Sequence, residues 1–160
     1  MDVRRAEKRL ARIFPDYFKN FTMPIGAREE VFKVYRACRS GKCDHLSFLP
    51  TFEEKGCICD DTEDLTDPSL YSLSTYEKPT HIKRFASLNS DMHVPYKIAI
   101  GLTEPIYGLV QPTKERKSKA GSHIDWWLYE GATPYEVFDL IPDFEEHLQE
   151  YKRRRDGVND

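Results

Sequence analysis

The sequence lacks both a long hydrophobic run and a strong excess of charge of either sign. No apolar stretch approaches the roughly 18 residues that a membrane-spanning helix needs, which argues against a membrane protein. Its 24 basic and 27 acidic residues give a net charge of −3, so bulk attraction to nucleic acid or to an anionic membrane is not expected. The first residues, 1–14, lack the apolar stretch and cleavage site of a secretory signal, so we expect a cytoplasmic protein.

No internal repeat and no clear linker divide the chain. Its 160 residues are the size of one domain, and a hydrophobic content of 39% is enough for a core and too high for a disordered chain. We therefore expect a single domain that spans residues 1–160.

Hydrophobic patterning predicts an α+β fold with a mixed, mostly antiparallel sheet of about five strands. Residues 1–20 are expected to form an N-terminal helix and residues 31–130 the core that contains the sheet. Residues 134–155 are predicted to form a C-terminal helical segment, divided into two short helices at Pro142. The clearest strand is at 96–103, where apolar and polar residues alternate and β-branched residues are frequent.

Both tryptophans, Trp126 and Trp127, are neighbours in one predicted strand, HIDWWLYE. Neighbours on a strand point to opposite faces of the sheet. The residues that share these faces are Ile124, Leu128 and Glu130 with Trp126, and His123, Asp125 and Tyr129 with Trp127. The first face is apolar, so Trp126 is predicted to lie in the core. The second face is mixed and typical of a cleft; the alternative is that other elements cover it too.

The four cysteines, Cys38, Cys43, Cys57 and Cys59, are concentrated in one short part of the chain. In a cytoplasmic protein they are expected to be reduced, and four thiolates can bind zinc. Their spacing, C-x4-C and then C-x-C, differs from the C-x2-C pairs of common structural zinc sites. The alternatives are ordinary core cysteines and a nucleophile, Cys38 or Cys43, with His123 as its base.

Two segments, VYRACRSG at 34–41 and YSLSTYEKPTHIKRFA at 71–86, follow one another in an order that resembles the ADP-ribosyltransferase-like fold. This resemblance implies a small mixed domain that binds NAD. It also implies that Arg36 contacts NAD and that Ser74 and Thr75 support the nicotinamide pocket. Glu130, at the end of a later strand, corresponds to the acidic residue of the family. The E-x-E motif of family members that modify arginine does not occur in this chain.

The chemistry of these residues fits that role. An arginine fork matches a pyrophosphate, and the ring of Tyr71, Tyr76 or Trp127 suits stacking on nicotinamide. The carboxylate of Glu130 would stabilise the positive charge that develops on the ribose as nicotinamide leaves. His123, on the same face as Asp125, is a candidate general acid or base.

The working hypothesis is therefore an ADP-ribosyltransferase-like protein that binds NAD or a related nucleotide and acts on a nucleotide or protein substrate. One alternative is a non-catalytic module that binds a protein partner through the same aromatic face. A second alternative is an accessory protein that binds nucleic acid through a basic loop. The residues of this loop and its aromatic neighbours are Lys114, Arg116, Lys117, Lys119, Tyr107 and Trp127.

Overall fold

The structure, a computed structural model, describes residues 12–57, 63–88 and 96–158. Cys59 and most of the predicted N-terminal helix lie outside the described residues. Within the described part, the 3-10 helix Asp16–Asn20 occupies the end of that prediction. It begins after Pro15, whose ring fixes the backbone at the residue that precedes the first turn.

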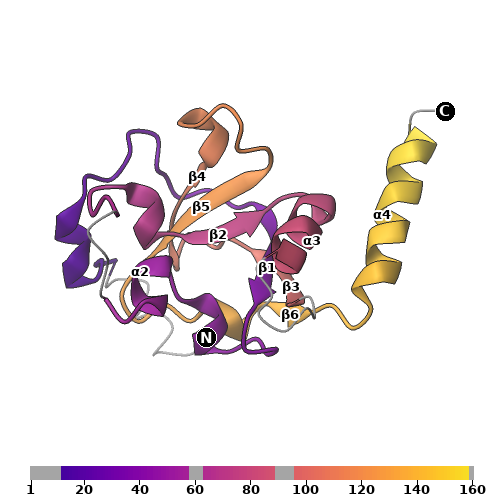
Figure 1. Cartoon of the computed structure of the whole chain (residues 1–160), viewed down its shortest axis with the longest axis horizontal. Coiled ribbons are helices and arrows are strands. Elements are labelled where there is room, and N and C mark those ends of the chain that lie inside the picture. The colour runs from indigo at the N-terminus through magenta and orange to yellow at the C-terminus, as the bar shows by residue number, and fades with distance from the viewer. Residues whose placement is uncertain (1–11, 58–62, 89–95, 159–160) are drawn as a thin grey trace.

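In the part of the chain that the structure describes, six strands form one sheet in which each paired strand runs antiparallel to its neighbour, in the order β4-β5-β2-β1-β3-β6 (Figure 1). The strands are β1 (Lys33–Cys38), β2 (Leu73–Tyr76), β3 (Lys97–Leu102), β4 (Gly108–Pro112), β5 (His123–Leu128) and β6 (Asp139–Leu140). The α+β prediction is confirmed, but the described sheet is wholly antiparallel rather than mixed.

Three α-helices accompany the sheet in the described part of the chain: α2 (Thr51–Glu54), α3 (Pro79–Leu88) and α4 (Phe144–Val158). Short 3-10 helices, besides the one already given, are His45–Phe48, Pro68–Tyr71, Thr113–Glu115 and Pro134–Glu136. The predicted helical segment 134–155 is helical over its second half only. Its first half forms one 3-10 turn and β6, so Pro142 separates a strand from a helix rather than two helices.

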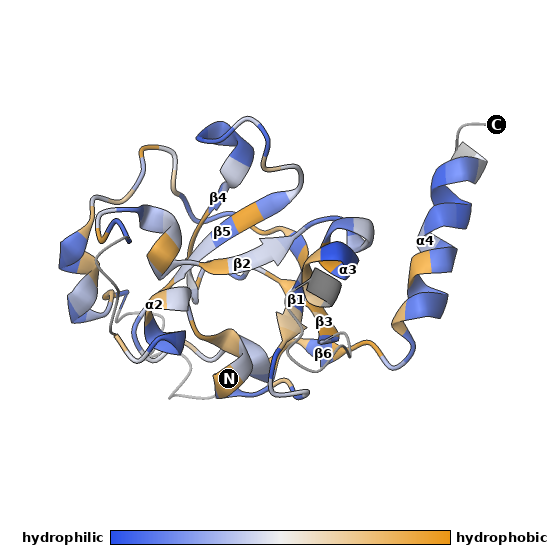
Figure 2. Ribbon diagram, viewed as in Figure 1, coloured by the Kyte–Doolittle hydropathy of each residue, from blue (hydrophilic) through white to orange (hydrophobic). Residues whose placement is uncertain are grey.

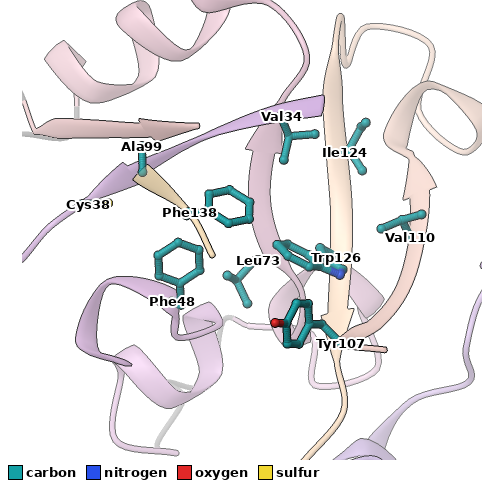
Figure 3. Packing of buried hydrophobic residues seen from close by; sticks show 10 residues of the cluster. All are labelled: Val34, Cys38, Phe48, Leu73, Ala99, Tyr107, Val110, Ile124, Trp126 and Phe138. Atoms are coloured by element: carbon teal, nitrogen blue, oxygen red, sulfur yellow. The ribbon is translucent and has the colours of Figure 1, made fainter. Parts of the chain in front are cut away.

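Both faces of the sheet are covered, and the buried side chains of the described residues form three hydrophobic clusters. The largest contains Trp126, Leu73 and Phe138, and Figure 3 shows the Phe138 and Phe48 rings on the same side of the sheet as the indole. The residues of β1 and β3 that alternate with those of the first cluster, including Tyr35 and Ile98, point to the other face of the sheet and pack against α3. The third cluster surrounds Trp127.

Helix α4 is mostly hydrophilic along its length (Figure 2). Its first turns contact the rest of the protein, because Leu148 is buried and His147 shares a hydrogen bond of 2.7 Å with the Tyr35 hydroxyl. Its last turns are exposed and carry the basic run Lys152–Arg155. Over the residues that the structure describes, no helix combines the length and apolar character needed to cross a membrane.

Candidate functional site

Both indoles are enclosed, and each has a relative exposure of 0%. The prediction that Trp126 lies in the core is confirmed. The prediction that Trp127 lines an open cleft is wrong, because aromatic residues from the N-terminal part of the described chain cover it. These covering residues belong to the third cluster and include Phe14, Tyr17, Phe18 and Phe21. The Trp127 Nε1–H donates to the Pro68 carbonyl at 2.9 Å, and the Arg116 guanidinium lies 5.5 Å from the indole.

Arg36 is buried and bonds to main-chain carbonyl oxygens. Its Nε donates to Ser47 at 2.9 Å and its Nη1 to Ser74 at 3.0 Å; Nη2 donates to Leu49 at 3.4 Å. Burial lowers the pKa of this guanidinium below its ordinary value. Arg36 therefore ties the loop after β1 to β2, and its fork is not presented to a ligand.

The other residues predicted to bind NAD do not share a cleft. Thr75 is buried and donates its hydroxyl proton to the Ile124 carbonyl at 2.9 Å, and Ser74 meets Arg36 through its own carbonyl. The Tyr71 ring is buried as well, and its hydroxyl donates to the Leu65 carbonyl at 2.7 Å. Because Arg36 and Trp127 are enclosed too, the prediction of NAD as a cofactor is wrong.

The prediction of zinc is also wrong for the residues that the structure describes, among which no cluster of three or more histidine, cysteine or acidic side chains is suited to a metal ion. Cys38 is buried in the core, whereas Cys57 is exposed in the turn that follows α2. Burial raises the pKa of the Cys38 thiol to about 12, and burial also raises the pKa of Cys43. Protonated thiols are poor metal ligands and poor nucleophiles.

One residue of the basic loop that follows β4 is bonded to groups inside the protein. Arg116 donates to the carboxylate of the buried Asp125 at 2.7 Å, to Gln111 at 2.5 Å and to Ser69 at 3.0 Å. This cation therefore compensates a buried charge. Lys114, Lys117 and Lys119 remain exposed, which leaves a smaller positive surface than the sequence suggests.

The main candidate site is a pocket of about 470 Å³ beside the carboxyl end of β5. Its walls come from the 3-10 helix Asp16–Asn20, from residues 45–53 and from the loop 128–135. Two of the residues predicted from sequence, Tyr71 and Glu130, contribute to it. The other acidic and aromatic residues of its lining are Asp16, Tyr17, Phe18, Phe48, Glu53, Tyr129 and Tyr135.

The pocket is negatively charged, with three carboxylates and no lysine or arginine among its described lining residues. Glu53 is held by the Tyr17 hydroxyl, which donates to it at 2.6 Å. Burial raises the pKa of Tyr17, as do this hydrogen bond and the nearby charges of Glu53 and Glu130. Burial and a hydrogen bond to Glu29 raise the pKa of Tyr129 to about 12. These phenols therefore stay neutral, and the carboxylates determine the charge of the pocket.

The sequence did not point to Asp16, Glu53 or Tyr135. Each comes from a different segment. No short motif contains two of the three acidic residues of the pocket, which are Asp16, Glu53 and Glu130. The only local signal is an aromatic residue beside an acid, as in Asp16–Tyr17 and Tyr129–Glu130, which is too common a pair to identify a site. The pocket forms because the fold brings these segments together at one end of β5.

The two predicted catalytic residues, His123 and Glu130, lie at opposite ends of β5. His123 opens the strand and Glu130 follows its end. His123 is partly buried, and its Nδ1 lies 2.5 Å from the Thr113 hydroxyl. Thr113 in turn lies 2.8 Å from the Asp125 carboxylate, so histidine and aspartate are linked through a threonine. His123 and Glu130 therefore belong to separate sites.

Comparison of the chain with protein-family models, with curated proteins and with solved structures gave no match in any of the three. The resemblance to the ADP-ribosyltransferase-like fold therefore stays a prediction.

Proposed function

We propose that this protein is a binding module that accepts a lysine or arginine side chain of a partner protein in the pocket at the carboxyl end of β5. The observation that carries the proposal is the composition of that pocket. Asp16, Glu53 and Glu130 lie in its lining, and no described lysine or arginine does.

Charge favours a cation in this position. A carboxylate attracts a cation more strongly where water is partly excluded than in bulk solvent. Glu53 is half-buried and its position is fixed by Tyr17, so part of the orientational cost is removed before a ligand arrives. A phosphate-bearing nucleotide would meet repulsion from the same carboxylates, which supports a cationic partner over the nucleotide of the initial hypothesis.

Aromatic rings add to this preference. A cation over an aromatic face is stabilised by roughly 0.5–2 kcal/mol, and arginine also stacks on such rings. Tyr135 is half-buried at the pocket, with its ring centroid 6.1 Å from that of His45 and 6.2 Å from that of Phe48. The Tyr17 ring forms another wall, and it stacks on the buried Tyr71 ring at 5.9 Å between centroids.

Exposed apolar side chains next to the pocket favour a protein partner over a free small cation. Ile13, which precedes the covering aromatic segment, and Leu46, which follows His45, are each 64% exposed. Apolar side chains beside a pocket can exclude water from a charged side chain that enters it, and arginine is enriched among the residues that contribute most to protein interfaces.

A titration with short peptides tests the proposal. Peptides with the same flanking residues and lysine, arginine, trimethyl-lysine or norleucine at the centre are added to the protein, and amide chemical shifts around Glu53, Glu130 and Tyr135 are followed. The cationic peptides are expected to bind about tenfold more tightly than the norleucine peptide, because norleucine keeps the aliphatic stem and lacks the charge.

The variant Glu53→Gln is expected to weaken the cationic peptides about tenfold while it still accepts the Tyr17 hydrogen bond. Glu146→Gln, an exposed carboxylate on α4, is the matched control and is expected to change nothing. Equal affinity for the lysine and norleucine peptides, or unchanged binding in Glu53→Gln, would contradict the proposal.

A further inference from the structure

A second pocket, of about 270 Å³, lies at the other end of β5, where that strand begins beside the start of α3. Its lining is unlike that of the acidic pocket, because it contains two imidazoles, two lysines and a serine. The lining residues are Glu77, Lys78, His81, Pro112, Lys114, Gly121, Ser122 and His123.

The hydrogen bonds of His123 determine which of its nitrogens carries a proton. The Thr113 hydroxyl has one proton, and its partner at 2.8 Å is the carboxylate of Asp125, which only accepts when ionised. The bond of 2.5 Å between Thr113 and His123 therefore needs a proton on the histidine Nδ1. In the neutral ring Nε2 is then an acceptor, and it is the nitrogen left for a ligand.

His81 has the opposite arrangement. The Ser122 backbone N–H donates to its Nδ1 at 3.3 Å, and the Ser122 hydroxyl lies 2.8 Å from the same atom. The hydroxyl also accepts the Lys78 backbone N–H at 3.2 Å. Since Nδ1 of His81 accepts, the neutral ring has its proton on Nε2, which makes it a donor.

The pocket thus combines one imidazole donor, one imidazole acceptor and the ammonium groups of Lys78 and Lys114. Among the described residues of its lining, Glu77 is the only acidic one, so the two lysines leave a net positive charge there. The amino end of α3 adds a positive partial charge beside it. A phosphate group has acceptor oxygens for the donors and, when singly protonated, a P–O–H for the acceptor.

We propose that this second pocket binds a phosphate group, either free or on a small phosphate monoester. Lys114 and Lys78 compensate its charge. His81 donates a hydrogen bond to it through Nε2, and His123 accepts a hydrogen bond from its P–O–H through Nε2. The pocket is too small for a long strand, and the net charge of −3 gives no bulk attraction to a polyanion. This proposal is independent of the cationic-ligand site.

Several charged groups influence the pKa of His123 together. Those with a direct influence are Asp125 on β5, Arg116 and Lys117 in the loop after β4, and Arg36 on β1. Tyr76 places its ring edge-on to the imidazole at 5.0 Å between centroids. Burial lowers the pKa of His123, and the three cations lower it further while Asp125 opposes them. A bound phosphate opposes this lowering.

The test is an NMR titration of the full chain with inorganic phosphate, in which the imidazole nitrogens of His81 and His123 are observed across pH. Phosphate is expected to bind in about the millimolar range and to raise the pKa of His123. Potassium chloride at the same ionic strength is expected to leave that pKa unchanged. Glycerol 3-phosphate in place of inorganic phosphate shows whether the ester binds more tightly and so identifies the source of the group.

Lys114→Gln is expected to weaken phosphate about fivefold or more, whereas Lys119→Gln, in the same loop but outside the pocket lining, is expected to bind as the unaltered protein does. An identical effect of chloride and phosphate on His123, or equal weakening in the two lysine variants, would overturn the proposal. Glu53→Gln is expected to leave phosphate binding intact, which separates this site from the acidic pocket.

Discussion

At the scale of single residues, Arg36 shows how a side chain with an apparent role in binding can be structural. An arginine between a strand and a polar turn is a natural candidate for an anion contact. In the fold, three of its nitrogens donate to main-chain carbonyl oxygens of Ser47, Leu49 and Ser74. Sequence spacing places Arg36 on a strand but does not reveal that the loop after that strand folds back over it.

Replacement of Arg36 is therefore expected to affect stability. Arg36→Met retains the aliphatic stem but removes the donors and leaves buried carbonyls without partners, at a cost of about 2–5 kcal/mol in the free energy of unfolding. Urea denaturation measures this loss. Arg84→Met, at an exposed position on α3, is the control and is expected to change the free energy of unfolding by less than about 0.5 kcal/mol. A stable Arg36→Met protein would show that the three hydrogen bonds contribute little.

The paired tryptophans show what a residue pattern can predict and what it cannot. Strand alternation correctly predicts that Trp126 faces the core. The cover over Trp127 comes from residues 14–23, more than a hundred positions earlier in the chain. Because strand periodicity describes only which way a side chain points, it contains no information on which distant segment packs against it.

At the scale of elements, local chemistry predicts the termini better than the extent of each element. Pro79 opens α3 at a position where its missing N–H is not needed. Asp44 caps the 3-10 helix His45–Phe48 by accepting the Ser47 N–H at 3.1 Å. The two-residue strand β6 was missed because it is too short to show alternation. It forms by pairing with β3.

At Gly108, where β4 pairs with β5, the two strands leave no room for a side chain. A Cβ on this residue would lie 2.0 Å from the Trp127 carbonyl oxygen. Gly108→Ala is therefore expected to separate the strands locally and to lower the free energy of unfolding by about 1–3 kcal/mol or more. Thermal and urea denaturation provide the measurement. Gly157→Ala, where a Cβ meets nothing within 4 Å, is expected to be neutral or slightly stabilising, and an equal loss in both variants would contradict the steric explanation.

At the scale of the whole molecule, the small net charge is the sum of acidic and basic regions that lie in different parts of the protein. Acidic residues line one end of β5, lysines and histidines line the other, and a basic run ends α4. Hydrophobic patterning predicted the correct fold class, because the fold class depends on patterns spread along the chain. It could not give either pocket, because each is assembled from segments that are distant in sequence.

Two partly buried histidines connect global stability to pH. Burial is the largest cause of the lowered pKa of both His123 and His147. The unfolded chain therefore binds protons at these residues more readily than the folded chain does. Their contribution to stability is present above the unfolded pKa of about 6.5 and is lost as the pH falls toward the folded pKa values.

The urea midpoint is consequently expected to fall between about pH 7 and pH 5. His123→Gln and His147→Gln are each expected to make this fall smaller, since a neutral amide removes the difference in proton binding. The exposed His45→Gln is the comparison. If all three variants keep the same pH dependence as the unaltered chain, buried histidine is not its cause.

The burial of both indoles also provides an optical reporter of the native state. Neither tryptophan lines the acidic pocket or the pocket beside α3. Emission from the two enclosed rings should shift to longer wavelength when water reaches them on unfolding, while a ligand that fills either pocket without opening the fold should leave the spectrum nearly unchanged. Intrinsic fluorescence would then distinguish loss of structure from occupancy in a single cuvette, with no added label.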